Sequence, residues 1–263
     1  MIKISPTILN TAVFICGLTF MFSAETFRPK RPWETPRPKR FLFHASLALI
    51  NAACVALLTS SPALLFANWV RAKGFGAAPA IGLAGPAEWL ASFIVLDMFD
   101  YWWHRFNHTI PFLWRFHKVH HVDTHVDATT SIRFHPGELI ISSLIVKPAW
   151  IFLWGPSALG LLFFEMGLTL SAQFHHSNID FPDRIESAVR KMIVTPRFHA
   201  SHHTVSKRTR EANFSAVFIF WDKIFGTYRE VDAEEMKTLG LPKGRNTYLS
   251  LKMALIGPFT NNY

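Results

Sequence analysis

The chain has 263 residues, half of them hydrophobic, and a formal net charge of +9. This length allows one large domain. The positive charges sit beside apolar runs, so they indicate membrane topology and exclude nucleic acid as the expected partner. The two cysteines, Cys16 and Cys54, lie inside apolar runs, which implies neither a disulfide framework nor a CxxC metal site.

The first apolar run extends from Pro6 to Ala24 without a charged residue and is long enough to span a membrane. A cleaved signal peptide is the alternative, but no convincing small-residue cleavage site precedes Glu25. We therefore favour a retained helix. The basic, proline-rich segment from Phe27 to Arg40 is the strongest positive-inside signal in the chain. We interpret it as a solvated anchor loop on the cytoplasmic side.

The next apolar run, from Phe41 to Val70, contains no Asp, Glu, Lys or Arg. It predicts a second helix over about 41–60, followed by a turn and an interfacial piece. His44 is interpreted as structural or as facing the headgroups. The segment from Lys73 to Pro86 is rich in Gly, Ala and Pro and predicts a loop on the opposite side. A third helix is expected from about Ala87 to Phe106, which returns the chain to the basic side.

The stretch from Asp97 to His125 starts as a hydrophobic helix and ends in a cluster of histidines. Twelve of the thirteen histidines of the chain lie between His104 and His203. On a helix, residues three or four apart share a face, so one stripe contains Asp97, Asp100, Tyr101, His104 and His108. A carboxylate one turn before a metal-binding histidine can hold the second ring nitrogen. The alternative is a charged helix end at the membrane surface.

Two HxxHH motifs follow, the first at His117, His120 and His121 and the second at His199, His202 and His203. On a helix the three imidazoles of such a motif point the same way. Together with the HxxxH pair they supply eight imidazoles, enough for two metal ions. Imidazole-rich sites suit iron, zinc, copper or nickel.

Two apolar runs, Leu139 to Trp154 and Ser157 to Phe174, flank a Gly-Pro pair and predict a helical hairpin that dips into the membrane and returns. Lys147 and Glu165 inside it either form a pair or face a cavity. The hairpin brings the sequence FHHSNID back to the histidine side. One or both of His175 and His176 are predicted to complete the metal shell. The spacing from His175 to Asp180 also fits the HxxxxD motif of glycerolipid acyltransferases, which would not need the other histidines.

The predicted fold class is all-α. We expect an integral membrane protein with about four transmembrane helices: the two N-terminal helices, the third helix and the helical hairpin. A helical, histidine-rich metal site would lie at the cytoplasmic face. Residues 1–86 would form the N-terminal helices and basic loop, 87–230 the catalytic domain and 231–263 a C-terminal tail without recognisable chemistry. This topology places every histidine group on one side of the membrane.

Six pieces of sequence, in this order, resemble the fatty acid hydroxylase/sterol desaturase superfamily: DYWWHRFNH, HKVHH, RFHP, HHSNID, HASHH and WDKIFGTY. The resemblance covers Asp97 to Tyr228, about half of the chain. It implies a membrane-integral, non-haem di-iron oxygenase. The implied ligands are His104, His108, His117, His120, His121, His175, His176, His199, His202 and His203. Asp97, Asp100, His135 and Asn178 would stand behind them as supporting residues.

The resemblance implies O2-dependent hydroxylation or desaturation of a C–H bond in a sterol, a fatty acyl chain or a related membrane lipid. Two Fe²⁺ ions would be the cofactors, with zinc as a possible substitute, and O2 the co-substrate. No flavin, haem or Rossmann motif is present, so the electrons would come from a separate donor of the ferredoxin, cytochrome or reductase type. A bacterial inner membrane is the expected location, or the endoplasmic reticulum in a eukaryote.

A membrane zinc hydrolase is the main alternative. Zinc also binds histidine, but a catalytic zinc needs only about three protein ligands. The sequence contains neither an HExxH nor a GxSxG motif. The third alternative is a metal-binding or structural membrane protein without turnover.

Overall fold

The structure is a computed structural model that describes residues 5–58 and 63–260. These residues form helices joined by loops, and within these ranges β-structure is limited to isolated bridges such as the one between Pro29 and Ile179. The predicted all-helical class is therefore confirmed. The end of the second helix expected near residue 60 lies outside the described residues.

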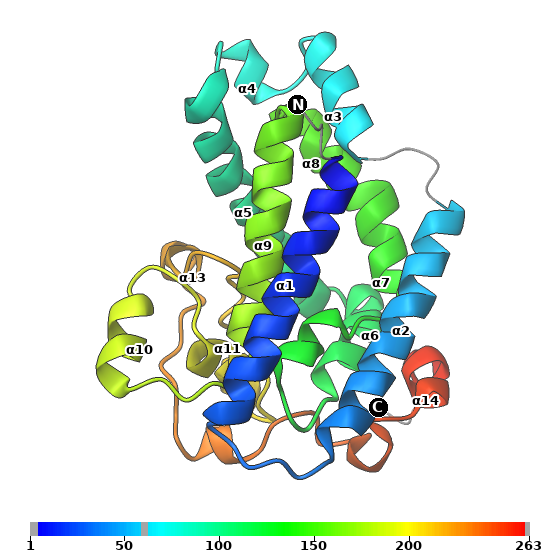
Figure 1. Cartoon of the computed structure of the whole chain (residues 1–263), viewed down its shortest axis with the longest axis vertical. Helices are drawn as coiled ribbons and strands as arrows, with labels where there is room; N and C mark the ends of the chain where they lie inside the picture. The colour runs from blue at the N-terminus through cyan, green and yellow to red at the C-terminus, as the bar shows by residue number, and fades with distance from the viewer. Residues whose placement is uncertain (1–4, 59–62, 261–263) are drawn as a thin grey trace.

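Long apolar helices run lengthwise through one half of the molecule (Figure 1). They are α1 (Pro6–Phe27), α2 (Arg37–Leu58), α5 (Gly85–Thr109) and α9 (Ala158–His176). Helix α9 packs against both α1 and α5. Ser5 caps α1 by accepting a hydrogen bond from the backbone N–H of Ile8, and Pro6 occupies the first turn, where its missing N–H costs nothing.

Within the described parts of the chain, three helical segments are long and apolar enough to cross a membrane: Pro6–Phe27, Arg37–Leu57 and Pro136–Trp154. A fourth candidate combines Ala63–Ala80 with Gly85–Thr109, two pieces that meet at 80°. The first piece contains the short helices α3 (Ala63–Ala72) and α4 (Ala77–Ala80). These three or four candidates agree with the membrane architecture expected from the apolar runs.

The predicted hairpin is present but begins earlier than expected. Helix α7 (Pro136–Ile141), the π-helical turn η2 (Ser142–Val146) and α8 (Lys147–Trp154) follow one another without a break. Gly155 ends α8 with φ of 71°, a left-handed conformation that glycine adopts without steric cost, and Ser157 then caps α9. Lys147 and Glu165 form an ion pair of 2.8 Å, which decides between the two alternatives for these residues.

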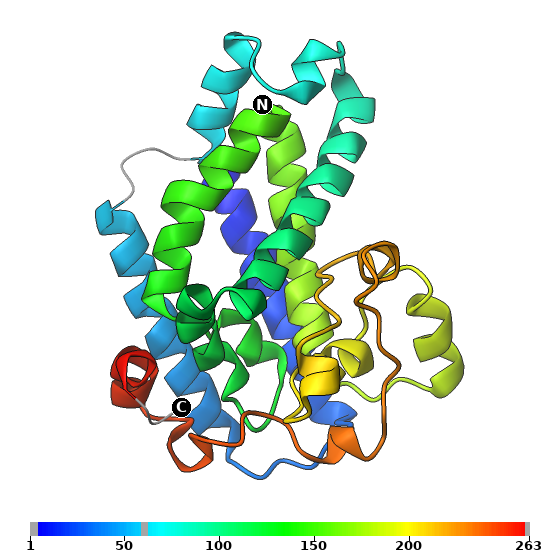
Figure 2. The ribbon, with the colours of Figure 1, turned by 180° about the vertical axis from the view of Figure 1, so that it is seen from behind.

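The remaining elements gather at the end of the bundle where α5 and α9 finish (Figures 1 and 2). Here lie α6 (Pro111–His121), η1 (Ala128–Ile132), α10 (Asp183–Val189), α11 (Pro196–His202), α12 (Lys207–Arg210) and α13 (Phe220–Ile224). The C-terminal segment adds η3 (Glu235–Lys237), η4 (Arg245–Thr247), α14 (Leu251–Ile256) and η5 (Gly257–Phe259). Ala254 of α14 is fully buried in a cluster with Phe43, Leu47 and Val119, so the tail packs on α2 and α6.

Candidate metal centre

Four helices bring the histidines of the three motifs and of FHHSNID to one end of the bundle. His104 and His108 lie at the end of α5, His176 ends α9, and the two HxxHH motifs lie on α6 and at the end of α11. Helix α11 starts where the sequence indicates, because the Thr195 hydroxyl caps it and Pro196 occupies its first turn. Segments nearly 100 residues apart in sequence therefore contribute side chains to the same place.

The histidines separate into two groups, within each of which the candidate ligand nitrogens all lie within 4.8 Å of one another. The first group contains His104, His108, His117, His121 and His202. The second group contains His120, His176, His199 and His203. All nine rings are buried except that of His104, which is partly buried. Nine imidazoles in two groups match the ligand sets that two metal ions would need.

In four of the nine rings, Nδ1 lies beside a backbone carbonyl and Nε2 faces another histidine of the same group. Backbone carbonyls lie at hydrogen-bond distance from Nδ1 of His104 (Phe214 O, 2.8 Å), His202 (Ala212 O, 2.6 Å), His120 (Arg133 O, 3.1 Å) and His176 (Ala172 O, 2.7 Å). A carbonyl oxygen only accepts, so Nδ1 must carry the hydrogen. In a neutral ring the other nitrogen, Nε2, then carries no hydrogen, and its lone pair is available to a metal.

These bare nitrogens face one another at short range. The Nε2 atoms of His104 and His202 are 3.0 Å apart, and so are those of His120 and His176. Two lone pairs at this distance repel unless a proton or a metal ion lies between them. Burial, together with neighbouring imidazoles, holds the pKa of His120 and His202 well below its ordinary value, which disfavours the proton.

Further nitrogens in the first group are buried without a hydrogen-bond partner among the described residues: both of His108, both of His121 and Nε2 of His117. Unsatisfied buried polar atoms are rare in folded proteins and ask for an explanation. A bound metal ion would take one nitrogen of each of these rings and would lie between the facing lone pairs, while Nδ1 of His108 lies 3.6 Å from a carboxylate oxygen of Glu211. The residues present therefore fit a pair of imidazole-ligated metal ions.

Asp97 was expected to orient a histidine, but its hydrogen bonds go elsewhere. Its carboxylate accepts from the backbone N–H groups of Val217 and Phe218 and from the indole N–H of Trp221. It thereby fixes the loop before α13. That loop supplies the carbonyl of Phe214 to His104, so Asp97 acts on the site through the backbone.

Asp222 of the WDKIFGTY segment fixes the same loop from its other side. Its carboxylate accepts from the backbone N–H groups of Phe214 and Ser215 and from the hydroxyl of Thr227. The aspartate and threonine of this segment therefore hold in place a loop whose carbonyl orients a candidate ligand. The sequence marked the segment by resemblance alone, and the structure supplies its physical role.

The other predicted residues occupy different places around the centre. His175 lies outside both groups, although its ring centroid is 4.1 Å from that of His199, and its Nδ1 is 2.9 Å from the carbonyl oxygen of Ala216. His135 caps α7 and stacks on Phe116. The side-chain amide of Asn178 bonds to both backbone groups of Arg31. Asp100 lines the cavity described below.

The basic loop is not simply a solvated anchor, so that interpretation was wrong for part of it. Arg40 is 1% exposed and donates to both carboxylate oxygens of Asp123 and to Asp127. The Nη2 group of Arg31 donates to the carbonyl of Val126 at 2.6 Å. The acidic loop that directly follows the first HxxHH motif draws these guanidinium groups inward, because a buried carboxylate needs a partner.

Two more groups complete this buried ionic cluster. Glu25 is fully buried at the end of α1, where it pairs with Arg37 at 2.7 Å and accepts from the backbone N–H groups of Ala128 and Asn178. His44 is also fully buried, 2.6 Å from the Thr129 hydroxyl, so it is structural and does not face headgroups. Helices α1 and α2 are thus bonded to the two segments that follow the candidate ligands His121 and His176.

Two residues important to this arrangement received no role from the sequence. Arg133 supplies its carbonyl to His120 and its guanidinium to the carbonyls of Val119 and Tyr248. Glu138 accepts from Nδ1 of His117 at 2.9 Å. The available signal was their position in SIRFHPGE, a charged segment directly before an apolar helix.

A cavity of about 310 Å³ reaches both histidine groups. Its polar wall includes His104 and His117 of the first group and His120, His176 and His199 of the second. Its apolar wall comes from helices that lead into the apolar half of the bundle, with Phe14 of α1, Leu139 of α7 and Leu168 of α9. A long apolar molecule with one end beside both groups would fit this shape.

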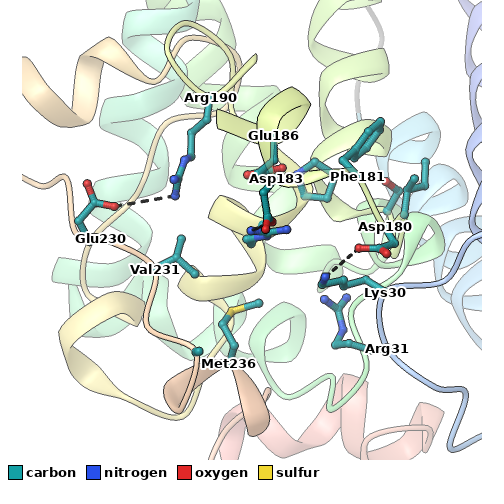
Figure 3. Close-up of a pocket in the computed structure, with 15 residues that line it drawn as sticks. Lys30, Arg31, Asp180, Phe181, Asp183, Glu186, Arg190, Glu230, Val231 and Met236 are labelled. Carbon is teal, nitrogen blue, oxygen red and sulfur yellow. Dashed lines mark ion pairs between the residues drawn. The ribbon is translucent and has the colours of Figure 1, made fainter. Parts of the chain in front are cut away.

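A second cavity of about 440 Å³ lies outside the bundle, between the basic loop, α10 and the segment before η3 (Figure 3). Charged side chains of both signs line it, and the ion pairs Lys30–Asp180 and Arg190–Glu230 cross its wall. Asp180 therefore faces this cavity, while His175 lines the first one. The two residues of the HxxxxD pattern are thus turned to different cavities, which argues against an acyltransferase site.

Comparison with known proteins agrees with this geometry. The family model described as fatty acid hydroxylase matches residues 89–227. Human alkylglycerol monooxygenase is 27% identical over 169 residues, which are 64% of this chain and 36% of that protein. A rice very-long-chain aldehyde decarbonylase, GL1-8 (Oryza sativa subsp. indica), is 32% identical over 150 residues, 55% of this chain and 54% of the relative. No solved structure matches the chain significantly.

The chain spans about a third of the length of the alkylglycerol monooxygenases that it matches. The matched region nevertheless contains all the histidines of both groups. Membrane-length apolar helices and a buried cluster of histidines at one end of the bundle are both present, as the sequence predicted. The chain is an integral membrane protein of the fatty acid hydroxylase family, within the fatty acid hydroxylase/sterol desaturase superfamily.

Proposed function

We propose that this protein hydroxylates a membrane lipid with O2 at a centre of two iron ions, one held by each histidine group. The observation that carries the proposal is the pair of Nε2–Nε2 separations of 3.0 Å, one in each group, between rings whose other nitrogen is already bonded. Bound iron would supply the activation of O2 and the attack on an unreactive C–H bond. Zinc is a possible substitute in the same imidazoles.

The protein's own contribution is to hold and shield the lipid. The apolar wall of the 310 Å³ cavity would bind an alkyl chain, while the histidines at its other end would lie beside the carbon to be oxidised. Burial of the site keeps bulk water away. We favour hydroxylation over desaturation because several of the similar proteins are named monooxygenases. An alkylglycerol-like lipid is the first substrate to test for the same reason.

The electrons would come from a separate donor of the ferredoxin, cytochrome or reductase type. The donor would approach from the cytoplasm, because Arg28, Lys30 and Lys39 lie exposed at the histidine end of the bundle and follow the positive-inside rule. We place the protein in a bacterial inner membrane, or in the endoplasmic reticulum of a eukaryote. Behind the ligands, Asp97, His135 and Asn178 would support the site through the backbone contacts described above.

The test combines metal content with oxygen labelling. Wild type and His120→Ala are expressed in cells grown with ¹⁸O2, and metal per chain and membrane lipids are compared. His125→Ala is a matched control, because this buried histidine packs against Trp33 with its ring tilted by 43° and belongs to neither group. We expect about two irons per chain and label in one lipid class for the wild type and the control only.

Other results would redirect the assignment. Iron together with a new double bond and no retained label indicates a desaturase. Zinc without any O2-dependent product contradicts the oxygenase proposal and favours a membrane zinc hydrolase.

A further inference from the structure

Glu138 on α7 joins the histidine centre to the cavity. The side chain is 4% exposed. Its Oε1 atom accepts from Nδ1 of His117 at 2.9 Å, whereas its Oε2 atom is buried without a hydrogen-bond partner among the described residues. Glu138 also lines the 310 Å³ cavity. One oxygen of this carboxylate is thus used by a candidate ligand, and the other is left without a donor.

Other features of the cavity also call for a donor. Asn107 lines it too, and its side-chain oxygen is buried and unsatisfied, while its amide nitrogen donates to the carbonyl of Trp103. Asp100 adds a second carboxylate to the wall. No lysine or arginine occurs among the described residues that line this cavity. A buried acceptor is costly when left unpaired, so the molecule that fills the cavity is expected to bring a hydrogen-bond donor.

A hydroxyl group suits this position better than an ammonium group. Two divalent ions in the histidine groups would repel a cationic headgroup, because His104 and His117 of the first group line the same cavity. A carboxylate headgroup has no hydrogen to donate. An uncharged lipid with a hydroxyl near the carbon to be oxidised satisfies both conditions.

We propose that Oε2 of Glu138 accepts a hydrogen bond from a hydroxyl of the bound lipid, while Oε1 orients His117. Glu138 is then the residue that selects hydroxyl-bearing lipids, and it couples their binding to the orientation of a metal ligand. This inference rests on the proposed function for the identity of the cavity as a lipid site. It adds the headgroup chemistry and the residue that recognises it.

The test measures binding to zinc-loaded protein in detergent micelles, which needs no turnover. Tritiated 1-hexadecanol is displaced by unlabelled 1-hexadecanol or by 1-methoxyhexadecane, which keeps the oxygen but lacks the O–H donor. In the wild type we expect the ether to bind at least about tenfold more weakly than 1-hexadecanol, because it loses a hydrogen bond to a charged group. In Glu138→Gln the ratio of the two dissociation constants, ether over alcohol, should fall to about one. The glutamine carbonyl still accepts from His117, but the side chain now presents its –NH2 group, a donor, to the cavity.

Two variants serve as controls. Glu165→Gln removes a carboxylate that pairs with Lys147 and does not line the cavity, so the ratio should stay at the wild-type value. Asp100→Asn changes the other carboxylate of the cavity wall and tests which of the two carboxylates accepts from the hydroxyl. A ratio near one in the wild type, meaning that water alone satisfies Oε2, would overturn the proposal. A ratio that collapses in Asp100→Asn but persists in Glu138→Gln would overturn it as well.

A second measurement needs no variant and covers the case that Glu138→Gln does not fold. In the cobalt-loaded wild type, 1-hexadecanol should shift the visible absorption bands, since the lipid shares Glu138 with His117, and the ether should leave them unchanged. Equal shifts with both ligands would contradict the proposal. Iron-loaded protein that oxidises no lipid while the tenfold ratio holds would reject the proposed function and leave the binding inference intact.

Discussion

Replacing Arg40 by methionine tests whether the buried ionic cluster supports the metal centre. Arg40 donates through Nε to Asp127 at 2.6 Å and through Nη1 and Nη2 to Asp123 at 2.8 Å each. Burial by itself would raise the pKa of Asp123, but the charge of Arg40 and its hydrogen bonds hold that pKa well below its ordinary value. Methionine keeps most of the volume and leaves two carboxylates buried without their main partner.

Removing one partner of a buried ion pair typically costs about 3–5 kcal/mol. For a chain of this size each kcal/mol lowers the unfolding midpoint by about 2–4 °C, so Arg40→Met should unfold on the order of 10 °C below the wild type. The stability that the pair contributes is present above the unfolded pKa of aspartate, about 3.9, and is lost as the pH falls through the lower folded value. The difference from the wild type should therefore shrink below about pH 4.

The assay is thermal unfolding in micelles, with metal per chain measured on the same samples. Lys39→Met is the matched control, because Lys39 is the exposed neighbour of Arg40 on α2 and surface changes usually stay within about 0.5 kcal/mol. Arg40→Met should also bind metal more weakly, since Asp123 lies two residues after the candidate ligand His121. Equal midpoints and metal contents for Arg40→Met and Lys39→Met would refute the reasoning.

Four further outcomes are expected. His176→Ala should lose metal from the second group while His175→Ala keeps it, and metal analysis giving equal losses would reject this division of the pair. Chelation should lower the unfolding midpoint and added metal should restore it; a midpoint indifferent to metal would contradict the two-ion site. Burial and neighbouring imidazoles hold the pKa of His199 and His203 well below its ordinary value, so the metal-free fold takes up fewer protons than the unfolded chain. The metal-free protein should therefore lose stability as the pH falls below about 6.5, by up to about 1.4 kcal/mol per pH unit for each such histidine. A free energy of unfolding of the metal-free protein that does not change from pH 7.5 to 5 would contradict this expectation. Asp97→Asn should cost about 1–3 kcal/mol by weakening three hydrogen bonds to the loop before α13, and unchanged unfolding would show that the loop is held by other contacts.

Local sequence patterns were enough to predict the helices and the nature of the site. Apolar runs without charge indicate membrane-length helices because the bilayer interior excludes charged groups. Thr195 and Pro196, at the start of TPRFHASHH, are residue types that favour the first positions of a helix, and α11 begins there. The spacing of four residues in HxxxH, and between the first and last histidines of HxxHH, places those two imidazoles on one helix face, which is a property of helix geometry and needs no tertiary information. The expectation that all three imidazoles of an HxxHH motif point the same way was wrong, because the middle histidine joins the other group.

Contacts between distant segments could not be predicted in this way. Arg40 belongs to a basic segment whose composition is typical of a solvated anchor, yet it lies in the first turn of α2 and is bonded to residues 83 and 87 positions further along the chain. The carboxylates that draw it inward follow a metal motif in sequence. Only the packing of α2 against η1 shows that they meet.

The division of the histidines is the clearest case of a feature that only the tertiary structure decided. Residue types and spacings determined that eight or more imidazoles would gather at one end of a helical membrane protein. They did not show that His120 and His121, or His202 and His203, belong to different groups. Neighbouring residues on a helix point about 100° apart, so each HxxHH motif presents ligands in two directions. Which direction meets which partner depends on how α5, α6, α9 and α11 pack against one another.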